Sequence, residues 1–128
     1  MDNVNLTVAE WDLMECLWEA SPRTGRELVD ALKLKKNWSK STTLTMLRRM
    51  TEKRLILCDE SGEVRKYSSL VNRETAVLQE TNDFLNRVFR GSVGLMMSTL
   101  TQKRDLSREE IQELYDILRQ AEEREDRH

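Results

Sequence analysis

The chain has 128 residues, of which 38% are apolar and 34% are charged, and its formal net charge is −2. This length suits one domain, or a small domain with a helical appendage, and no apolar run approaches the ~20 residues that a membrane-spanning helix requires. The only histidine is His128 and the only cysteines are Cys16 and Cys58, which excludes a disulfide scaffold, a four-ligand zinc site and a histidine general base in the body of the chain.

Charge is distributed unevenly along the chain. Residues 1–32 have a net charge of −5, residues 33–54 have +7, residues 55–72 have −1 and residues 73–128 have −3. A run of charge is often only a solvated helix face. The meaning of the basic block therefore depends on the element that carries it.

Two helix starts stand out in the acidic N-terminal part. Thr7–Glu10 and Thr24–Glu27 both have the capping-box pattern, in which a hydroxyl residue precedes a glutamate by three positions. Ser21–Pro22 ends the first of these helices. The apolar residues that follow the two starts at helical spacing are Trp11, Met14, Leu17 and Trp18 in the first helix, and Leu28, Val29 and Leu32 in the second.

A third helix and a β-hairpin come next. Residues 37–39 interrupt the helical pattern, and Ser39 or Ser41 can cap a helix with Thr43, Met46, Leu47 and Met50 on its inner face. Residues 55–58 are a short apolar run without helical spacing, and residues 64–68 are a second run after a Gly-bearing turn. Two such runs around a turn predict a β-hairpin.

Three more helices are predicted after Asn72. The first ends at Arg90–Gly91, the second covers residues 93–100, and the third follows a capping box at Ser107–Glu110; the charged end, residues 122–128, is expected to fray. Helices of 10–15 residues are marginal alone in water, so these need a partner surface, and a second copy of the chain is the simplest one. The candidate dimerisation residues are Phe84, Leu85, Val88, Phe89, Leu95, Met96, Leu100, Ile111, Leu114, Tyr115 and Leu118.

This order of elements predicts a mainly α fold with a small β-hairpin. Three helices with a hairpin behind them form the winged helix-turn-helix, in which the later helix enters the major groove of DNA and the hairpin lies along the backbone. We therefore expect a winged-helix DNA-binding domain over residues 1–71 and a helical dimerisation region over residues 72–128.

The basic block lies on the third helix and the segments beside it. Its outer face has hydroxyl residues that allow close approach to base edges, and arginines that can reach phosphates. Leu44 on this face is either a partly packed surface leucine or a contact to a thymine methyl group, and the two interpretations weigh equally. Trp38 is expected to pack between helices rather than to stack on nucleic acid. The candidate DNA-contacting residues are Ser39, Lys40, Ser41, Thr42, Leu44, Thr45, Arg48, Arg49, Lys53, Arg65 and Lys66.

The chain resembles a known family at these segments. LTVAEWDLMECLW, NWSKSTTLTMLRRMTEKRLI, YSSLV, FLNRVFRGSV and DLSREEIQELYDIL are similar to the penicillinase and methicillin-resistance repressors (BlaI/MecI/CopY type), over about residues 6–121. The resemblance implies a homodimeric repressor on a palindromic double-stranded operator, often of TACA/TGTA type, in a resistance or stress-response operon. Residues that match the pattern of the family are Thr42, Thr45 and Arg49 in the recognition helix, Trp38–Ser39 before the helix begins, and Lys53 where it ends.

Some positions depart from the pattern of the family. Lys40–Ser41 stands where relatives commonly have Pro-Lys, and Leu44 replaces a polar or basic residue. The wing carries Asp59, Glu60 and Glu63 where relatives tend to be more basic. Since acidic side chains repel phosphate, contact by the wing must rest on Arg65 and Lys66 or be weak.

The resemblance also implies a release mechanism. Antibiotic-responsive members are cleaved between Asn and Phe in the fifth helix after a membrane sensor detects a β-lactam, and the corresponding residues here are Thr99 and Leu100. A place in the dimer core is the favoured interpretation of this pair, with a cleavage site for a sensor-linked protease as the alternative. The copper-responsive branch binds metal through C-terminal cysteines, which this chain lacks, so no metal and no cofactor are expected.

Two other function classes stay open. Winged helices also serve as protein-interaction modules, and Met96 and Met97 could line the pocket of a small-molecule-responsive regulator. No enzyme is expected, because the body of the chain lacks histidine, a Gly-rich phosphate loop and a carboxylate pair in an apolar setting. With no signal-peptide pattern, a cytoplasmic location without membrane contact is expected.

Overall fold

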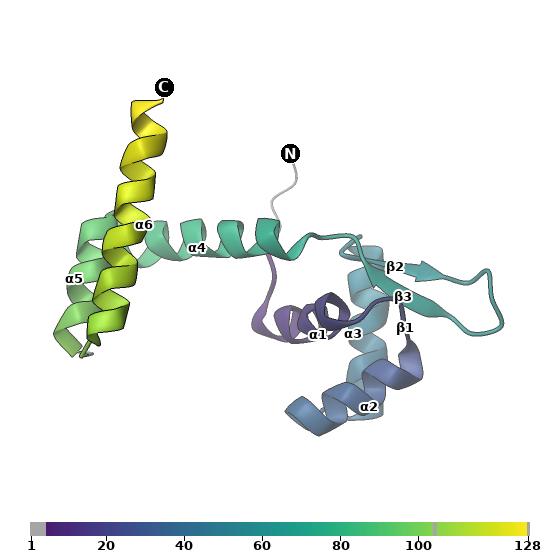
Figure 1. The fold of residues 1–128 in the computed structure, drawn as a ribbon. Coiled ribbons are helices and arrows are strands. Elements are labelled where there is room, and N and C mark those ends of the chain that lie inside the picture. The colour runs from purple at the N-terminus through teal and green to yellow at the C-terminus, as the bar shows by residue number, and fades with distance from the viewer. Residues whose placement is uncertain (1–4, 104, 128) are drawn as a thin grey trace. The chain divides into compact units, whose positions relative to one another are not determined.

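The computed structural model describes residues 5–103 and 105–127, which are mostly helical with a small sheet (Figure 1). The predicted order of three helices, a hairpin and three more helices is confirmed, and a two-residue strand is added. The elements are α1 (Val8–Glu19), β1 (Arg23–Thr24), α2 (Gly25–Lys36), α3 (Lys40–Glu52), β2 (Ile56–Asp59), β3 (Lys66–Ser69), α4 (Arg73–Phe89), α5 (Val93–Lys103) and α6 (Arg108–Asp126). The chain divides into two compact units between Asp83 and Phe84, within α4.

The predicted capping boxes form in the structure. Thr7, Thr24 and Ser107 each accept a hydrogen bond from the backbone N–H three residues on, and the glutamate at that position accepts one from the cap backbone. Each box satisfies two amide groups at a helix start. The helix boundaries are therefore fixed locally by sequence. α6 continues through Asp126, so most of residues 122–128, for which fraying is predicted, is helical, and residue 128 lies outside the described residues.

The sheet has the strand order β1-β3-β2, and both pairings are antiparallel. β2 and β3 form the predicted hairpin, with Cys58 opposite Tyr67 and Asp59 opposite Lys66. Thr24, the N-cap residue of α2, also lies opposite Lys66. The sheet thus joins the start of α2 to β3 of the hairpin, which is the wing of the fold.

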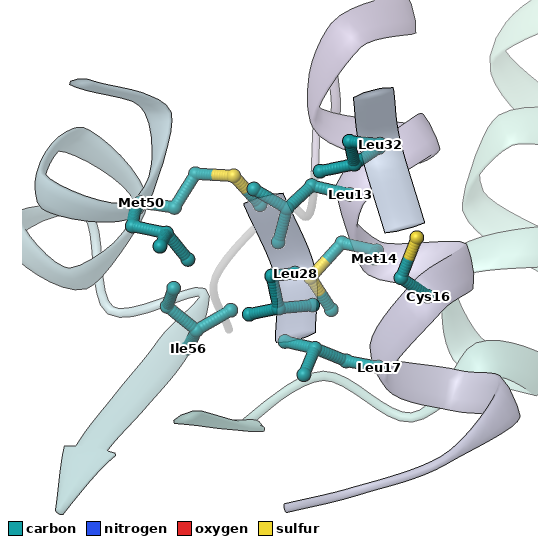
Figure 2. Close-up of a cluster of buried hydrophobic side chains, with 9 residues drawn as sticks. Leu13, Met14, Cys16, Leu17, Leu28, Leu32, Met50 and Ile56 are labelled. Atoms are coloured by element: carbon teal, nitrogen blue, oxygen red, sulfur yellow. The ribbon is translucent and has the colours of Figure 1, made fainter. Parts of the chain in front are cut away.

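A single apolar core holds the first unit together. Figure 2 shows buried side chains from α1, α2, α3 and β2 directed toward one another. Trp38 packs against this core as predicted, and burial raises the pKa of the Cys16 thiol, as suits a small buried residue. The buried cluster comprises Leu13, Met14, Cys16, Leu17, Leu28, Leu32, Leu47, Met50 and Ile56.

The second unit, from Phe84 onward, is different. Among the side chains that the structure describes in this unit, none is buried. Many of its large apolar side chains are exposed instead, among them Val93, Leu95, Ile117 and Leu118. Across the described residues, no helix is long and apolar enough to span a membrane.

Candidate nucleic-acid interface

The start of α3 presents a cluster of hydroxyl groups. Ser39 is the N-cap residue, and its Oγ accepts a hydrogen bond from the Thr42 backbone N–H at 3.1 Å. The same Oγ lies 3.2 Å from Ser41 Oγ and 2.9 Å from Thr42 Oγ1. Of the two caps that the sequence allows, the structure therefore uses Ser39, and it places three of the predicted contact residues together at the surface.

The start of α3 also differs electrostatically from the starts of α1, α2 and α6. α1, α2 and α6 carry glutamates in their first turns, whereas the first turn of α3 has no acidic residue and begins with Lys40. A helix N-terminus has a partial positive charge and unpaired N–H groups. Without a carboxylate to neutralise it, this end of α3 favours an anion.

The outer face of α3 continues with Leu44, Thr45, Arg48 and Arg49. Thr43, Leu47 and Met50 point into the core and Met46 packs against it, as predicted. Arg48 makes an exposed ion pair with Glu52 at 3.6 Å. Among the described residues, no carboxylate pairs with Arg49 or Lys40. Both cations are therefore available to a phosphate or a base edge.

A hollow of about 460 Å³ lies between α3 and the wing. Leu44, 45% exposed, lines it together with Arg48 and Thr51 of α3 and with Cys58, Arg65 and Tyr67 of the hairpin. Burial, and then the neighbouring Cys58 thiol, raise the pKa of Tyr67, so the phenol stays neutral at ordinary pH. The exposure of Leu44 is compatible with both of its sequence-based interpretations.

The basic residues of the wing are opposed by acidic ones. Arg65 Nε lies 3.0 Å from Glu60 Oε1, and Lys66 is the register partner of Asp59. Hydrogen bonds from Ser61, together with Lys66, lower the pKa of Asp59, which keeps this carboxyl ionised. The wing is thus a weak source of positive potential.

Lys53 is engaged with α1 rather than free. Its Nζ donates to Glu10 Oε2 at 2.7 Å, while Glu10 Oε1 accepts the Thr7 backbone N–H at 2.9 Å. Burial alone would raise the pKa of Glu10, but the hydrogen bonds from Lys53 and Thr7 and the charge of Lys53 outweigh it, so the pKa lies below its ordinary value. This pair joins the start of α1 to the end of α3.

The second unit contains a groove of about 640 Å³ between α5 and α6. Four of the predicted dimerisation residues line it, namely Ile111, Leu114, Tyr115 and Leu118. Thr99 and Leu100 are exposed on α5. Met97, which the sequence already offered as a pocket-lining residue, lines this groove as well. The other apolar lining residues were not among those predicted: Val93, Leu106 and Ile117.

The described residues offer no grouping of three His, Cys, Asp or Glu side chains that could hold a metal ion. The chemistry of the site is therefore that of hydroxyl groups, cations and one apolar side chain on a helix.

Comparison with known proteins gives the same picture. Residues 6–120 match the family described as "Penicillinase repressor". The methicillin resistance regulatory protein MecI of Staphylococcus aureus (strain N315) is 28% identical over 120 residues, which cover 92% of this chain and 98% of that protein. The penicillinase repressor of Bacillus licheniformis is 31% identical over 110 residues, or 86% of each chain.

Solved structures show the same fold. The DNA-binding domain of the repressor BlaI in solution is similar with a TM-score of 0.52 at 24% identity, covering 58% of this chain and 90% of that one. The Bacillus licheniformis BlaI monomeric form in complex with the blaP half-operator matches to the same extent, with a TM-score of 0.52. These likenesses confirm the predicted winged-helix fold.

Proposed function

The chain belongs to the penicillinase repressor family, whose members are DNA-binding transcriptional repressors and not enzymes, and we propose that it acts as a homodimer on a palindromic operator. In this proposal α3 of each protomer reads one half-site in the major groove, and the second units join the two protomers.

The observation that carries the proposal is the composition of the α3 surface. The first turn of α3 has a cluster of hydroxyl groups and no carboxylate. Thr45 follows on the same face, and two arginines lie one turn beyond Thr45. Hydroxyl groups bond either donors or acceptors on base edges, and arginine is the commonest specific contact to guanine. The solved BlaI complex with a half-operator is a precedent in a protein of the same fold.

Lys53 has a different role in this proposal from the one that the sequence indicated. Its ammonium group is held by Glu10, which is almost fully buried. We therefore assign Lys53 to fixing the C-terminal end of α3, and leave phosphate contact to Lys40, Arg48 and Arg49.

The proposed dimer rests on the second unit. Because that unit has an apolar groove and no buried side chain of its own among those described, it needs another surface to cover it. A second copy is the occupant that we propose, since two copies would cover each other's grooves and would present two α3 helices to a palindrome. For the boundary we propose the division between Asp83 and Phe84, where the chain splits into two compact units, in place of the predicted boundary after residue 71.

The proposal places Thr99 and Leu100 in this dimer region. Leu100 is one of its exposed apolar side chains. We favour dimer packing as their role. Cleavage between them by a sensor-linked protease would release DNA by breaking the same region, so the two interpretations differ in mechanism and not in location.

Selection of bound fragments from genomic DNA by the full-length protein tests the proposal. The expected result is a short palindrome upstream of a small set of genes, bound with an affinity that falls steeply with salt, by about 0.9 in log K per phosphate contact for each unit of log salt. Recovery of random fragments at non-specific affinity would contradict it. The matched control is Arg49→Ala together with Thr45→Ala, which removes the candidate base contacts without touching the core and should abolish enrichment of the palindrome.

A further inference from the structure

One face of α1 is directed at the start of α4. Glu15 Oε1 accepts hydrogen bonds from three donors: Trp11 Nε1 at 3.1 Å, Arg73 Nε at 3.2 Å and Arg73 Nη2 at 3.1 Å. Trp11 and Arg73 thus converge on a single carboxylate oxygen. Because the carboxylate is held from both sides, its position and that of the guanidinium group are defined together.

The next turn of α1 adds a second attachment. Trp18 Nε1 donates to the carbonyl oxygen of Val71 at 2.9 Å, and the Arg73 guanidinium carbon lies 5.8 Å from the centroid of a Trp18 ring. The Trp18 ring also meets Trp11 edge to face, with centroids 5.2 Å apart. The residues on both sides of Asn72 are therefore bound to α1 through different chemistry.

Asn72 defines where α4 begins. Its Oδ1 accepts the backbone N–H of Glu74 at 2.8 Å, which caps the first turn of the helix. Glu15, Trp18, Val71 and Arg73, which we call the α1–α4 clamp, therefore hold the chain at the position where the helix starts.

The remaining residues of α4 are mostly exposed. Ala76 is the one fully buried residue in the helix, and Glu80 lines a small hollow beside Leu6, Val8 and Trp11. α4 nevertheless continues as one helix of 17 residues. At 1.5 Å per residue such a helix is about 25 Å long, so a change of about 10° at its start displaces its end by about 4 Å.

From this arrangement we propose that the α1–α4 clamp is a positioning element that sets which distance between operator half-sites the dimer accepts. The inference rests on the proposed function, because it needs two α3 helices bound to one duplex. Each base pair inserted between half-sites rotates one relative to the other by about 34–36°. A dimer follows that rotation only if the α4 helices can change direction, and the clamp opposes such a change.

The test uses full-length protein and a series of duplexes in which the centre of the palindrome is lengthened or shortened by one or two base pairs. Wild type should bind one spacing and lose affinity sharply on either side. Arg73→Ala removes the ion pair and the cation–π contact in both protomers. It should leave affinity for the optimal spacing within about threefold, and it should reduce the penalty for a one-base-pair change by about five- to tenfold.

Two controls separate positioning from general damage. Arg87→Ala removes the same side chain from the last turn of the same helix, and it should keep the wild-type spacing profile. Arg73→Lys keeps the charge and should restore part of the discrimination. Binding to a duplex with a single half-site should be the same for wild type and Arg73→Ala, since none of the clamp residues lies on α3.

The possible outcomes are distinct. If Arg73→Ala keeps the wild-type spacing profile, or if it weakens the single half-site and every spacing equally, the positioning role is overturned. If wild type itself shows no preference for a palindrome over a single half-site, the proposed homodimeric function fails and the inference fails with it.

Discussion

At the scale of single residues, the α3 surface separates side chains that are available to DNA from those used within the fold. Arg49 and Lys40 have no carboxylate partner among the described residues, whereas Lys53 is bound to Glu10. Net charge in the sequence does not distinguish these cases, because all three residues lie in the same basic block. Only the packing of α1 against α3 identifies Lys53 as part of an internal pair.

Leu44 provides the sharpest residue-level test of base recognition. If its side chain contacts a thymine methyl group, Leu44→Ala should weaken binding to the selected operator by about 3- to 10-fold. Replacing that thymine by uracil should then weaken wild type but not the variant. Leu34→Ala, which alters an exposed leucine on α2, is the matched control. Equal loss with uracil in wild type and variant would rule out the methyl contact.

Glu10 gives a pH-dependent prediction. Its pKa in the folded protein lies below the ordinary value of 4.5, so the carboxylate contributes stability that is present above about pH 4.5 and lost as the pH falls through the folded-state pKa. Glu10→Gln should lower the free energy of unfolding by about 1–2 kcal/mol at pH 7. The difference should shrink as the pH falls below about 4.5 and should vanish once the pH lies below the folded-state pKa of Glu10.

Urea denaturation followed by tryptophan fluorescence at pH 7, 5 and 3.5 measures this difference. Glu19→Gln, which breaks an exposed pair with Lys35, should leave stability nearly unchanged. A stability difference between wild type and Glu10→Gln that stays constant across the pH range would show that the charge of Glu10 does not stabilise the fold.

At the scale of elements, sequence patterns predicted the helices and the hairpin well because their signals are local. Capping boxes at Thr7, Thr24 and Ser107 fix helix starts through contacts three residues apart. β1 was missed because it has two residues and exists only through its pairing with β3, 42 to 44 residues later in the chain. The α1–α4 clamp was missed for the same reason, since Glu15 and Arg73 are 58 residues apart.

The wing is the element whose contribution is easiest to change. Glu60→Gln removes an acidic charge and frees Arg65 from its ion pair. It should raise affinity for the operator about 3- to 10-fold. It should also make the slope of log K against log salt steeper by about 0.9, which corresponds to one more phosphate contact. Titrations at several salt concentrations measure both quantities.

Asp116→Asn is the matched control for the wing variant, because it changes the net charge equally and frees Arg119 from its ion pair on α6. Its affinity and slope should equal those of wild type. An unchanged slope for Glu60→Gln would mean that Arg65 does not reach the DNA.

At the scale of the whole molecule, the net charge of −2 conceals a positive segment of +7 at residues 33–54. The rest of the chain is net acidic and would repel phosphate. We expect each protomer to bind DNA through the α3 face alone, so that a dimer offers two copies of that face. This arrangement suits a site-specific dimer better than a general DNA binder. The second unit, with its uncovered groove, supplies the reason for the second copy.

Ile117→Asp tests the proposed dimer. The side chain is 49% exposed and lines the groove, so a charge there should weaken self-association at least about 30-fold. Sedimentation equilibrium should show monomers at concentrations where wild type is dimeric. Gln120→Asp adds the same charge outside the groove lining and should stay dimeric, and persistence of the dimer in Ile117→Asp would exclude this groove as its interface.

Hydroxyl-radical footprinting of the full-length protein on its selected operator tests the central claim most directly. The proposed homodimer predicts two protected regions on the same face of the duplex, centred about one helical turn or ~34 Å apart, with two chains bound per site. A single protected region with one chain per site, or uniform protection without a preferred face, would contradict it.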